Sequence, residues 1–216
     1  MKQILIPEKI EQYADIMTSD EDDLLATVNK ETVASHPLHH MLSGKVQGQF
    51  LTFISQLLQP KYVLDIGTFT GYSALCLAAG LQHNGQLHTI ELRSEDAATA
   101  QINFSKYNEH KKIHLHIGKA LDIIPTLPYK WDLVFIDADK TGYIDYYEMV
   151  LPMVNNNGII IADNVLFHGQ VLEQPLKSKS AKAIDAFNKY IAADKRVSQV
   201  LLTVRDGLLL IKKIPQ

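Results

Sequence analysis

The sequence predicts an α/β fold, in which a mostly parallel sheet carries helices on both faces and closes with an antiparallel hairpin. Two observations predict it. From residue 62 onward, short apolar runs alternate with segments long enough to be helices, which is typical of βαβ units. Near the C-terminus, two further apolar runs flank an Asp-Gly pair, which is a common hairpin turn.

The predicted elements follow in order along the chain. Residues 1–60 have the mixed spacing of two or three helices, and Pro60 ends the last of them. This last helix carries a helical face made of Phe50, Phe53, Ile54, Leu57 and Leu58. The predicted strands are 62–66, 86–90, 113–117, 132–136 and 158–162, with helices at 71–81, 94–108, 119–126 and 142–154, and a hairpin of 197–204 and 208–214. We expect one domain over residues 1–216, with 1–60 as an N-terminal helical cap region.

Composition indicates a single soluble domain. The chain has 216 residues, 46% of them apolar, and 21 basic against 24 acidic side chains give a formal charge of −3. This balance disfavours nucleic acid and membrane surfaces as partners, and no apolar stretch is long enough to span a bilayer. Cys76 is the single cysteine, so no intrachain disulfide can form, which favours a cytoplasmic setting. Pro7 interrupts the opening too early for a signal peptide.

A glycine loop follows the first predicted strand. Residues 65–73 read DIGTFTGYS, and the backbone of Gly67 and Gly71 can approach a ligand closely. The spacing lacks the close glycine pair of the dinucleotide fingerprint, so a purely structural turn stays an alternative. Glu91 closes the second strand, where a carboxylate can accept hydrogen bonds from both ribose hydroxyls. Together these features predict an adenosine-containing ligand.

Side chains with oxygen atoms that could bind a metal ion follow the fourth and fifth predicted strands. Asp137 follows one strand, and Asp163 with Asn164 follows the other, so they should meet at one edge of the sheet. Carboxylate and amide oxygens suit Mg²⁺ or Mn²⁺. Lys140 should project towards the same crevice. The alternatives are that each acid caps a helix, or that a metal binds at His36, His39 and His40 instead.

Three motifs in this order resemble the cation-dependent O-methyltransferases, the group that contains catechol and caffeoyl-CoA O-methyltransferases. They are DIGTFTGYS at 65–73, FIDADK at 135–140 and DNVLFHG at 163–169. The resemblance implies a Rossmann-like, doubly wound, seven-stranded sheet and S-adenosylmethionine as cofactor. It also implies a homodimer, with the N-terminal helices at or near the interface.

The resemblance also implies roles for individual residues. The implied cofactor-binding residues are Met41, Ser43, Asp65, Gly67, Tyr72, Ser73, Glu91, Ala120 and Asp137. The implied ligands of Mg²⁺, with Mn²⁺ or Ca²⁺ as alternatives, are Asp137, Asp163 and Asn164. The implied substrate contacts are Met41, Lys140, Asn164 and Phe167. Lys140 and Asp137 are the expected catalytic residues, with Lys140 as a general base whose pKa is depressed.

The expected reaction is methyl transfer to one hydroxyl of a catechol-type small molecule. Val46 and Gln47 stand where the caffeoyl-CoA branch tends to carry an acidic pair, and the chain lacks a long insertion for a coenzyme A tail. Both departures disfavour the caffeoyl-CoA alternative. A NAD-dependent oxidoreductase and a non-catalytic nucleotide-binding module are the alternatives from other classes.

Overall fold

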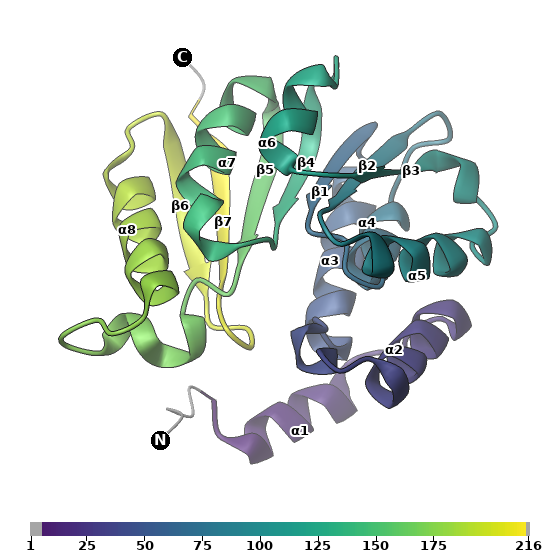
Figure 1. The fold of residues 1–216 in the computed structure, drawn as a ribbon, viewed down its shortest axis with the longest axis horizontal. Helices are drawn as coiled ribbons and strands as arrows, with labels where there is room; N and C mark the ends of the chain where they lie inside the picture. The colour runs from purple at the N-terminus through teal and green to yellow at the C-terminus, as the bar shows by residue number, and fades with distance from the viewer. Residues whose placement is uncertain (1–5, 215–216) are drawn as a thin grey trace.

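Seven strands pair into one sheet in the computed structural model, which describes residues 6–214 (Figure 1). Their spatial order is β3-β2-β1-β4-β5-β7-β6. Strands β1 to β5 run parallel to one another, and β7 runs antiparallel to both β5 and β6. The predicted fold class is therefore confirmed. The strands are β1 (Tyr62–Ile66), β2 (Gln86–Glu91), β3 (Ile113–Ile117), β4 (Trp131–Ile136), β5 (Val154–Asp163), β6 (Val197–Leu202) and β7 (Leu208–Lys213).

Helices cover both faces of the sheet, and each face carries its own core. Val63, Leu133 and Phe135 face the cluster that contains residues of α2 to α5, whereas Leu64, Val134 and Ile136 face the cluster of α6 to α8. This alternation along each strand follows from the twofold side-chain period of extended backbone. The α-helices are α1 (Glu8–Met17), α2 (Asp23–Ser35), α3 (Lys45–Leu58), α4 (Tyr72–Ala78), α5 (Ser94–Ser105), α6 (Ala120–Ile123), α7 (Tyr143–Val150) and α8 (Lys179–Ala193).

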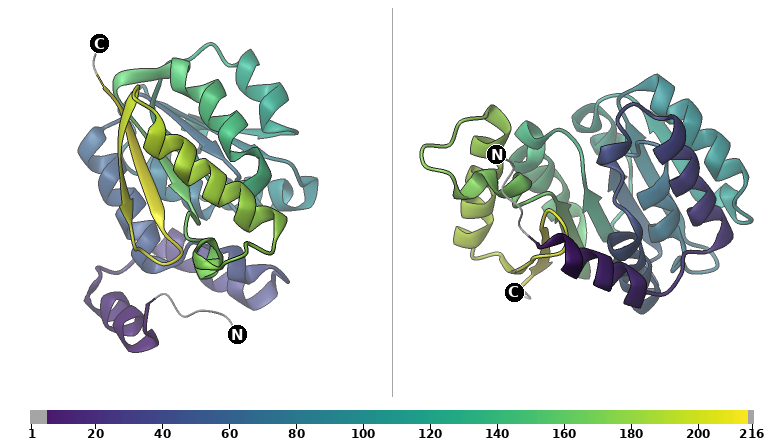
Figure 2. Two further views of the ribbon diagram at one scale, coloured as in Figure 1. Left: turned by 90° about the vertical axis from the view of Figure 1, so that its left-hand side faces the viewer. Right: turned by 90° about the horizontal axis from the view of Figure 1, so that it is seen from below.

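Short 3₁₀ helices join several of these elements. They are η1 (His39–Met41), η2 (His110–Lys112), η3 (Ile124–Thr126), η4 (Lys140–Gly142), η5 (Leu151–Met153) and η6 (Phe167–Leu172). Helices α1 and α2 lie beyond the end of the sheet where η6 and the β6–β7 turn also lie (Figures 1 and 2). The N-terminal helices therefore cover the carboxyl ends of the parallel strands.

Helix α8 is absent from the predicted elements. Its buried residues Ala181, Ile184, Phe187 and Ile191 lie on one helical face. Ser178 caps its first turn, because the Ser178 hydroxyl accepts a hydrogen bond of 3.0 Å from the amide of Ala181. Strand β5 also begins four residues before the predicted start, and β6 ends two residues early.

The apolar face predicted for α3 is only partly buried. Phe53 and Leu57 are 61% and 67% exposed, whereas Leu51 is fully buried. Small residues determine which face of α3 is buried. At Gly48, for example, the helix lies so close to α4 that a Cβ would be 2.3 Å from the Tyr72 hydroxyl. Helix α3 therefore packs against α4 through the face of Gly48, Leu51 and Ser55, and the two large side chains point outward.

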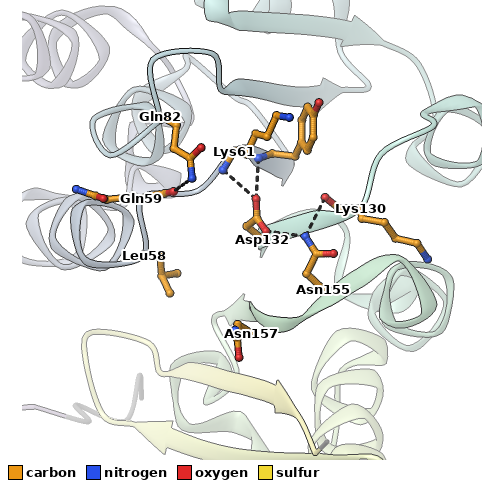
Figure 3. A pocket seen from close by; sticks show the side chains of 9 residues that line it. Leu58, Gln59, Lys61, Gln82, Lys130, Asp132, Asn155 and Asn157 are labelled. Carbon is orange, nitrogen blue, oxygen red and sulfur yellow. Dashed lines mark hydrogen bonds between the residues drawn. The ribbon is translucent and has the colours of Figure 1, made fainter.

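Asp132 ties the starts of three strands together at the opposite end of the sheet. Its Oδ2 accepts hydrogen bonds from the backbone amides of Lys61 (2.8 Å) and Tyr62 (3.0 Å). Its Oδ1 accepts one from Asn155 Nδ2 at 2.6 Å (Figure 3). The bonded residues line a pocket of about 320 Å³, and the bonds link the starts of β1, β4 and β5.

Two further expectations concern the ends of the chain and membranes. Within residues 6–214, no helix has the length and apolar character that a membrane span requires. The sequence predicts no signal peptide at the N-terminus, and the first five residues of that segment lie outside the described residues. Cys76 is buried and carries a free thiol.

Candidate active site

A cavity of about 1220 Å³ lies at the carboxyl ends of β1, β2, β4 and β5. It brings together the glycine loop, Glu91 and the acids that follow β4 and β5. All of the predicted site residues except Asp65 line it: Met41, Ser43, Gly67, Tyr72, Ser73, Glu91, Ala120, Asp137, Lys140, Asp163, Asn164 and Phe167. The lining residues come from segments spread between Ile6 and Asp206, so the cavity forms only when the whole chain folds.

The glycine loop needs its first glycine for two reasons. Gly67 has a φ of +105°, which L side chains rarely adopt. A Cβ at this position would also lie 2.0 Å from the carbonyl oxygen of Asp137. The loop therefore presses directly against the end of β4, and this contact places the glycine backbone beside Asp137.

Glu91 fixes the loop from the neighbouring strand. Its side chain accepts hydrogen bonds from the amide of Phe69 (2.7 Å, Oε2) and the amide of Arg93 (2.9 Å, Oε1). The residue is 7% exposed and lines the cavity. Each carboxylate oxygen has a second lone pair, so Glu91 can accept further hydrogen bonds from a bound ligand.

Asp65 lies behind the cavity wall. It is fully buried, and its Oδ2 accepts hydrogen bonds from Thr89 Oγ1 (2.7 Å) and Ser73 Oγ (3.4 Å). Its Oδ1 has no hydrogen-bond partner among the described residues. Burial raises the pKa of Asp65 to about 8, and the charges of Asp137 and Glu91 add to the rise. Its most direct route to a ligand is therefore through Ser73, which does line the cavity.

Lys140 joins the two acidic strand ends. Its Nζ donates to Asp137 Oδ1 (2.8 Å), Asn164 Oδ1 (2.7 Å) and the hydroxyl of Tyr143 (2.7 Å). Burial alone would lower the pKa of Lys140, but Asp137, Tyr143 and Asp163 raise it above the ordinary value. The expectation of a depressed pKa is therefore wrong for this arrangement, because the ammonium group faces two carboxylates.

Asp163 is held from two directions. Its Oδ1 accepts the amide of Asn164 at 2.6 Å, and its Oδ2 accepts Nε2 of Gln47 at 2.6 Å. Burial, with the charge of Asp137, raises the pKa of Asp163. Asn164 has a φ of +55°, a left-handed conformation that asparagine tolerates better than most residues.

The donors at these strand ends are two carboxylates and one amide. Among residues 6–214, no group of three or more His, Cys, Asp or Glu side chains is arranged to hold a metal ion. The alternative histidine site is not formed, because His36 Nε2 bonds to Asp96 at 3.0 Å and its ring packs edge-on to Phe69.

Gln47 and Arg205 are among the cavity residues that the predicted site does not include. Arg205 lies at the β6–β7 turn, and its Nη1 donates to the carbonyl of Leu42 at 2.7 Å. This bond ties the hairpin to the segment before α3 that carries Met41 and Ser43. The sequence marks Gln47 only as a departure from the caffeoyl-CoA branch and Arg205 only as part of a turn, so their contacts with Asp163 and Leu42 emerge only once distant segments are packed together.

Comparison with known proteins identifies the family. The model of the O-methyltransferase family matches residues 15–214. The chain belongs to this family. This O-methyltransferase is 33% identical over 200 residues to a catechol O-methyltransferase of Niastella koreensis, with 90% of each chain covered. It is 37% identical over 205 residues to a probable caffeoyl-CoA O-methyltransferase of Dictyostelium discoideum, with 90% of this chain and 89% of the relative covered.

Similar solved structures support S-adenosylmethionine as the cofactor. The O-methyltransferase superposes on an SAH-bound methyltransferase of Podospora anserina with a TM-score of 0.89, at 27% identity, covering 96% of this chain and 95% of the other. An O-methyltransferase of Bacillus cereus in complex with SAH gives 0.87 at 29% identity, covering 95% and 97%. The protein is thus an enzyme that uses S-adenosylmethionine to methylate an oxygen atom.

Proposed function

We propose that this O-methyltransferase methylates one hydroxyl of a catechol-type small molecule, with a divalent cation held by Asp137, Asp163 and Asn164. The observation that carries the proposal is that oxygens of Asp137 and Asn164 converge on one cationic group, in a cavity that Asp163 also lines. The ammonium of Lys140 lies 2.8 Å from Asp137 Oδ1 and 2.7 Å from Asn164 Oδ1. The donor set is therefore oriented towards a positive charge, and hard oxygens are what Mg²⁺, Mn²⁺ or Ca²⁺ prefer.

The cofactor half of the cavity follows from the glycine loop. When bound, S-adenosylmethionine supplies the electrophilic methyl group. Glu91 is the proposed acceptor for the ribose hydroxyls, and Gly67, Tyr72 and Ser73 are proposed to line the methionine part. Asp65 orients Ser73 from behind, while Ala120 is proposed near the adenine. Met41 and Ser43 cover the cofactor from the N-terminal side.

The acceptor half is built around Lys140 and Phe167. When bound, a divalent cation supplies Lewis-acid chemistry that lowers the pKa of a chelated hydroxyl. Asn164 and Lys140 orient the acceptor, and Phe167 packs on its ring. Lys140 can take the hydroxyl proton at Nζ only if the charge of Asp137 is engaged elsewhere, because that carboxylate favours the protonated ammonium. Holding both reactants in line contributes to the rate by proximity.

The cation requirement gives the first prediction. We expect EDTA to abolish methylation of a catechol and excess Mg²⁺ to restore it. Asp163→Ala should lower the rate in Mg²⁺ by more than about 100-fold, since loss of a ligand should exceed the 10–100-fold effect of outer-shell partners. Labelled S-adenosylmethionine measures the transfer. Glu95→Ala, which removes an exposed acid outside the cavity lining, is the matched control. Full activity in EDTA would refute the cation site.

A caffeoyl-CoA acceptor is the second candidate, and the name of the Dictyostelium relative favours it. A panel of free catechols, catechol acids, catechol amines and caffeoyl-CoA separates the two. The proposal expects higher kcat/KM for free catechols, and a preference for the thioester would replace it.

We also propose a homodimer that uses the N-terminal helices. Support comes from the exposed apolar side chains Phe53 and Leu57 on α3 and Tyr13 and Ile16 on α1. The prediction is that Phe53→Glu with Leu57→Glu shifts the mass measured by light scattering from two chains to one without unfolding the protein. A wild-type mass of one chain would overturn it. One domain over 1–216, with 1–60 as the cap, and a cytoplasmic setting without nucleic acid or membrane partners remain predictions from the sequence.

A further inference from the structure

Gln47 connects the N-terminal helices to the acidic end of β5. It lies in the first turn of α3, and its Nε2 donates to Asp163 Oδ2 at 2.6 Å across 116 positions of sequence. The two residues are 1% and 3% exposed. A hydrogen bond between two buried polar groups is stronger than one in water, because the local dielectric constant is low.

This bond completes the set of partners around Asp163. The other oxygen, Oδ1, is engaged by the amide of Asn164 at 2.6 Å, so both oxygens have a fixed donor. The carboxylate plane is therefore set by two contacts, one from its own strand and one from α3. If Gln47 lost its amide, Asp163 would keep only the backbone contact and could rotate.

The side-chain amide of Gln47 is also neutral, so it adds no charge to the site. Lys140 pairs with Asp137, and Asp163 adds a second acidic side chain to the site. A donor at position 47 can orient Asp163 without adding a charge, whereas a carboxylate there would face Asp163 at hydrogen-bond distance. Gln47 thus combines a fixed geometry with an unchanged net charge.

We propose that Gln47 is a positioning residue for the cation site: it fixes the carboxylate of Asp163 in the orientation that binds the cation. This inference rests on the proposed function. Gln47 acts through Asp163 and needs no contact with the acceptor. Groups that hydrogen-bond to a ligating side chain commonly change metal affinity by about 10–100-fold when removed.

The test measures Mn²⁺ binding to the full chain, without cofactor or acceptor. Electron paramagnetic resonance reports free Mn²⁺ and gives the affinity without any activity assay. Gln47→Met keeps the length of the side chain and removes the donor, and we expect it to weaken Mn²⁺ binding by about 10–100-fold. Gln49→Met, two residues along α3, is the matched control, because Gln49 bonds to the backbone of Asp20 outside the cavity. We expect this control to bind Mn²⁺ as the wild type does.

The outcomes separate the two proposals. If wild-type protein and Asp163→Asn bind Mn²⁺ equally weakly, the cation site itself is refuted. If the wild type binds tightly and Gln47→Met binds equally tightly, only the role of Gln47 is refuted. A lower melting temperature at unchanged affinity would assign Gln47 to packing alone and also overturn the inference. Gln47→Asn, whose amide is one carbon too short to reach Asp163, is the second variant if Gln47→Met does not fold, and the same loss is expected.

Discussion

Glu91 combines loop positioning with a proposed ligand contact. Its two oxygens already accept the amides of Phe69 and Arg93. In Glu91→Gln, one oxygen becomes an NH₂ group that faces a backbone N–H, so both the loop and the ribose contact should suffer. We expect the Kd for S-adenosylmethionine to rise about 10–100-fold, equivalent to about 1.4–2.7 kcal/mol. Isothermal titration measures it.

The control for this change is Glu95→Gln, an exposed acid in the first turn of α5. It removes the same charge near the same end of the sheet and should leave the Kd within about twofold, because a surface charge contributes little. Equal effects of the two variants would mean that Glu91 acts only through bulk charge.

Individual site residues could be predicted where a strand end fixes their position. Glu91, Asp137 and Asp163 each follow an apolar run, and parallel strands bring their carboxyl ends to one edge. The pairing of Lys140 with Asn164, and of Gln47 with Asp163, depends on distances between separate segments. No local pattern encodes such distances, which is why the raised pKa of Lys140 and the contact of Gln47 were missed.

Asp132 shows how one side chain supports several strands. Its carboxylate accepts three hydrogen bonds from residues at the starts of β1 and β5 (Figure 3). Asp132→Ala should lower the free energy of unfolding by about 2–4 kcal/mol, because two backbone amides lose a charged acceptor. The Kd for S-adenosylmethionine should hardly change, since the cavity lies at the opposite ends of the strands. Urea denaturation and titration of the cofactor measure the two effects.

The matched control is Asp185→Ala, which removes an acid paired with exposed Lys189 along α8. Such a pair contributes at most about 0.5 kcal/mol. If Asp132→Ala were no more destabilising than this control, the three hydrogen bonds would not hold the strand starts together.

Strands were easier to predict than the faces of helices. A buried parallel strand is a short apolar run, and five of these runs were located to within a few residues. The face of α3 was harder, because it packs through Gly48 and Ser55 rather than through its largest side chains. Hydrophobic periodicity predicts that phenylalanine lies on the buried face rather than glycine. Where two helices pack closely, the small residue is the one that lies between them. Helix α8 carried a usable signal in the Ser178 cap.

A stack of three histidines makes the stability of the whole molecule depend on pH. His88 on β2 stacks with His114 and His116 on β3, at ring-centroid distances of 4.8 and 5.3 Å. Its Nδ1 lies 3.0 Å from Nε2 of His116, while Tyr129 and Trp131 cover it. Burial, together with the charges of His114 and His116, lowers the pKa of His88 to about 3.

This shift determines the direction of the pH effect. The folded protein holds His88 neutral, whereas the unfolded chain takes up a proton near pH 6.5. Stability is therefore complete above pH 6.5 and falls as the pH drops towards 3. At pH 5 the loss from His88 should be about 2 kcal/mol relative to pH 8. His88→Phe keeps an aromatic ring in the stack but cannot titrate, so urea denaturation at both pH values should show a difference smaller by that amount. His110→Phe replaces an exposed histidine near the same edge and should retain the wild-type difference. If His88→Phe and His110→Phe showed the same pH dependence of stability, a group other than His88 would be responsible for it.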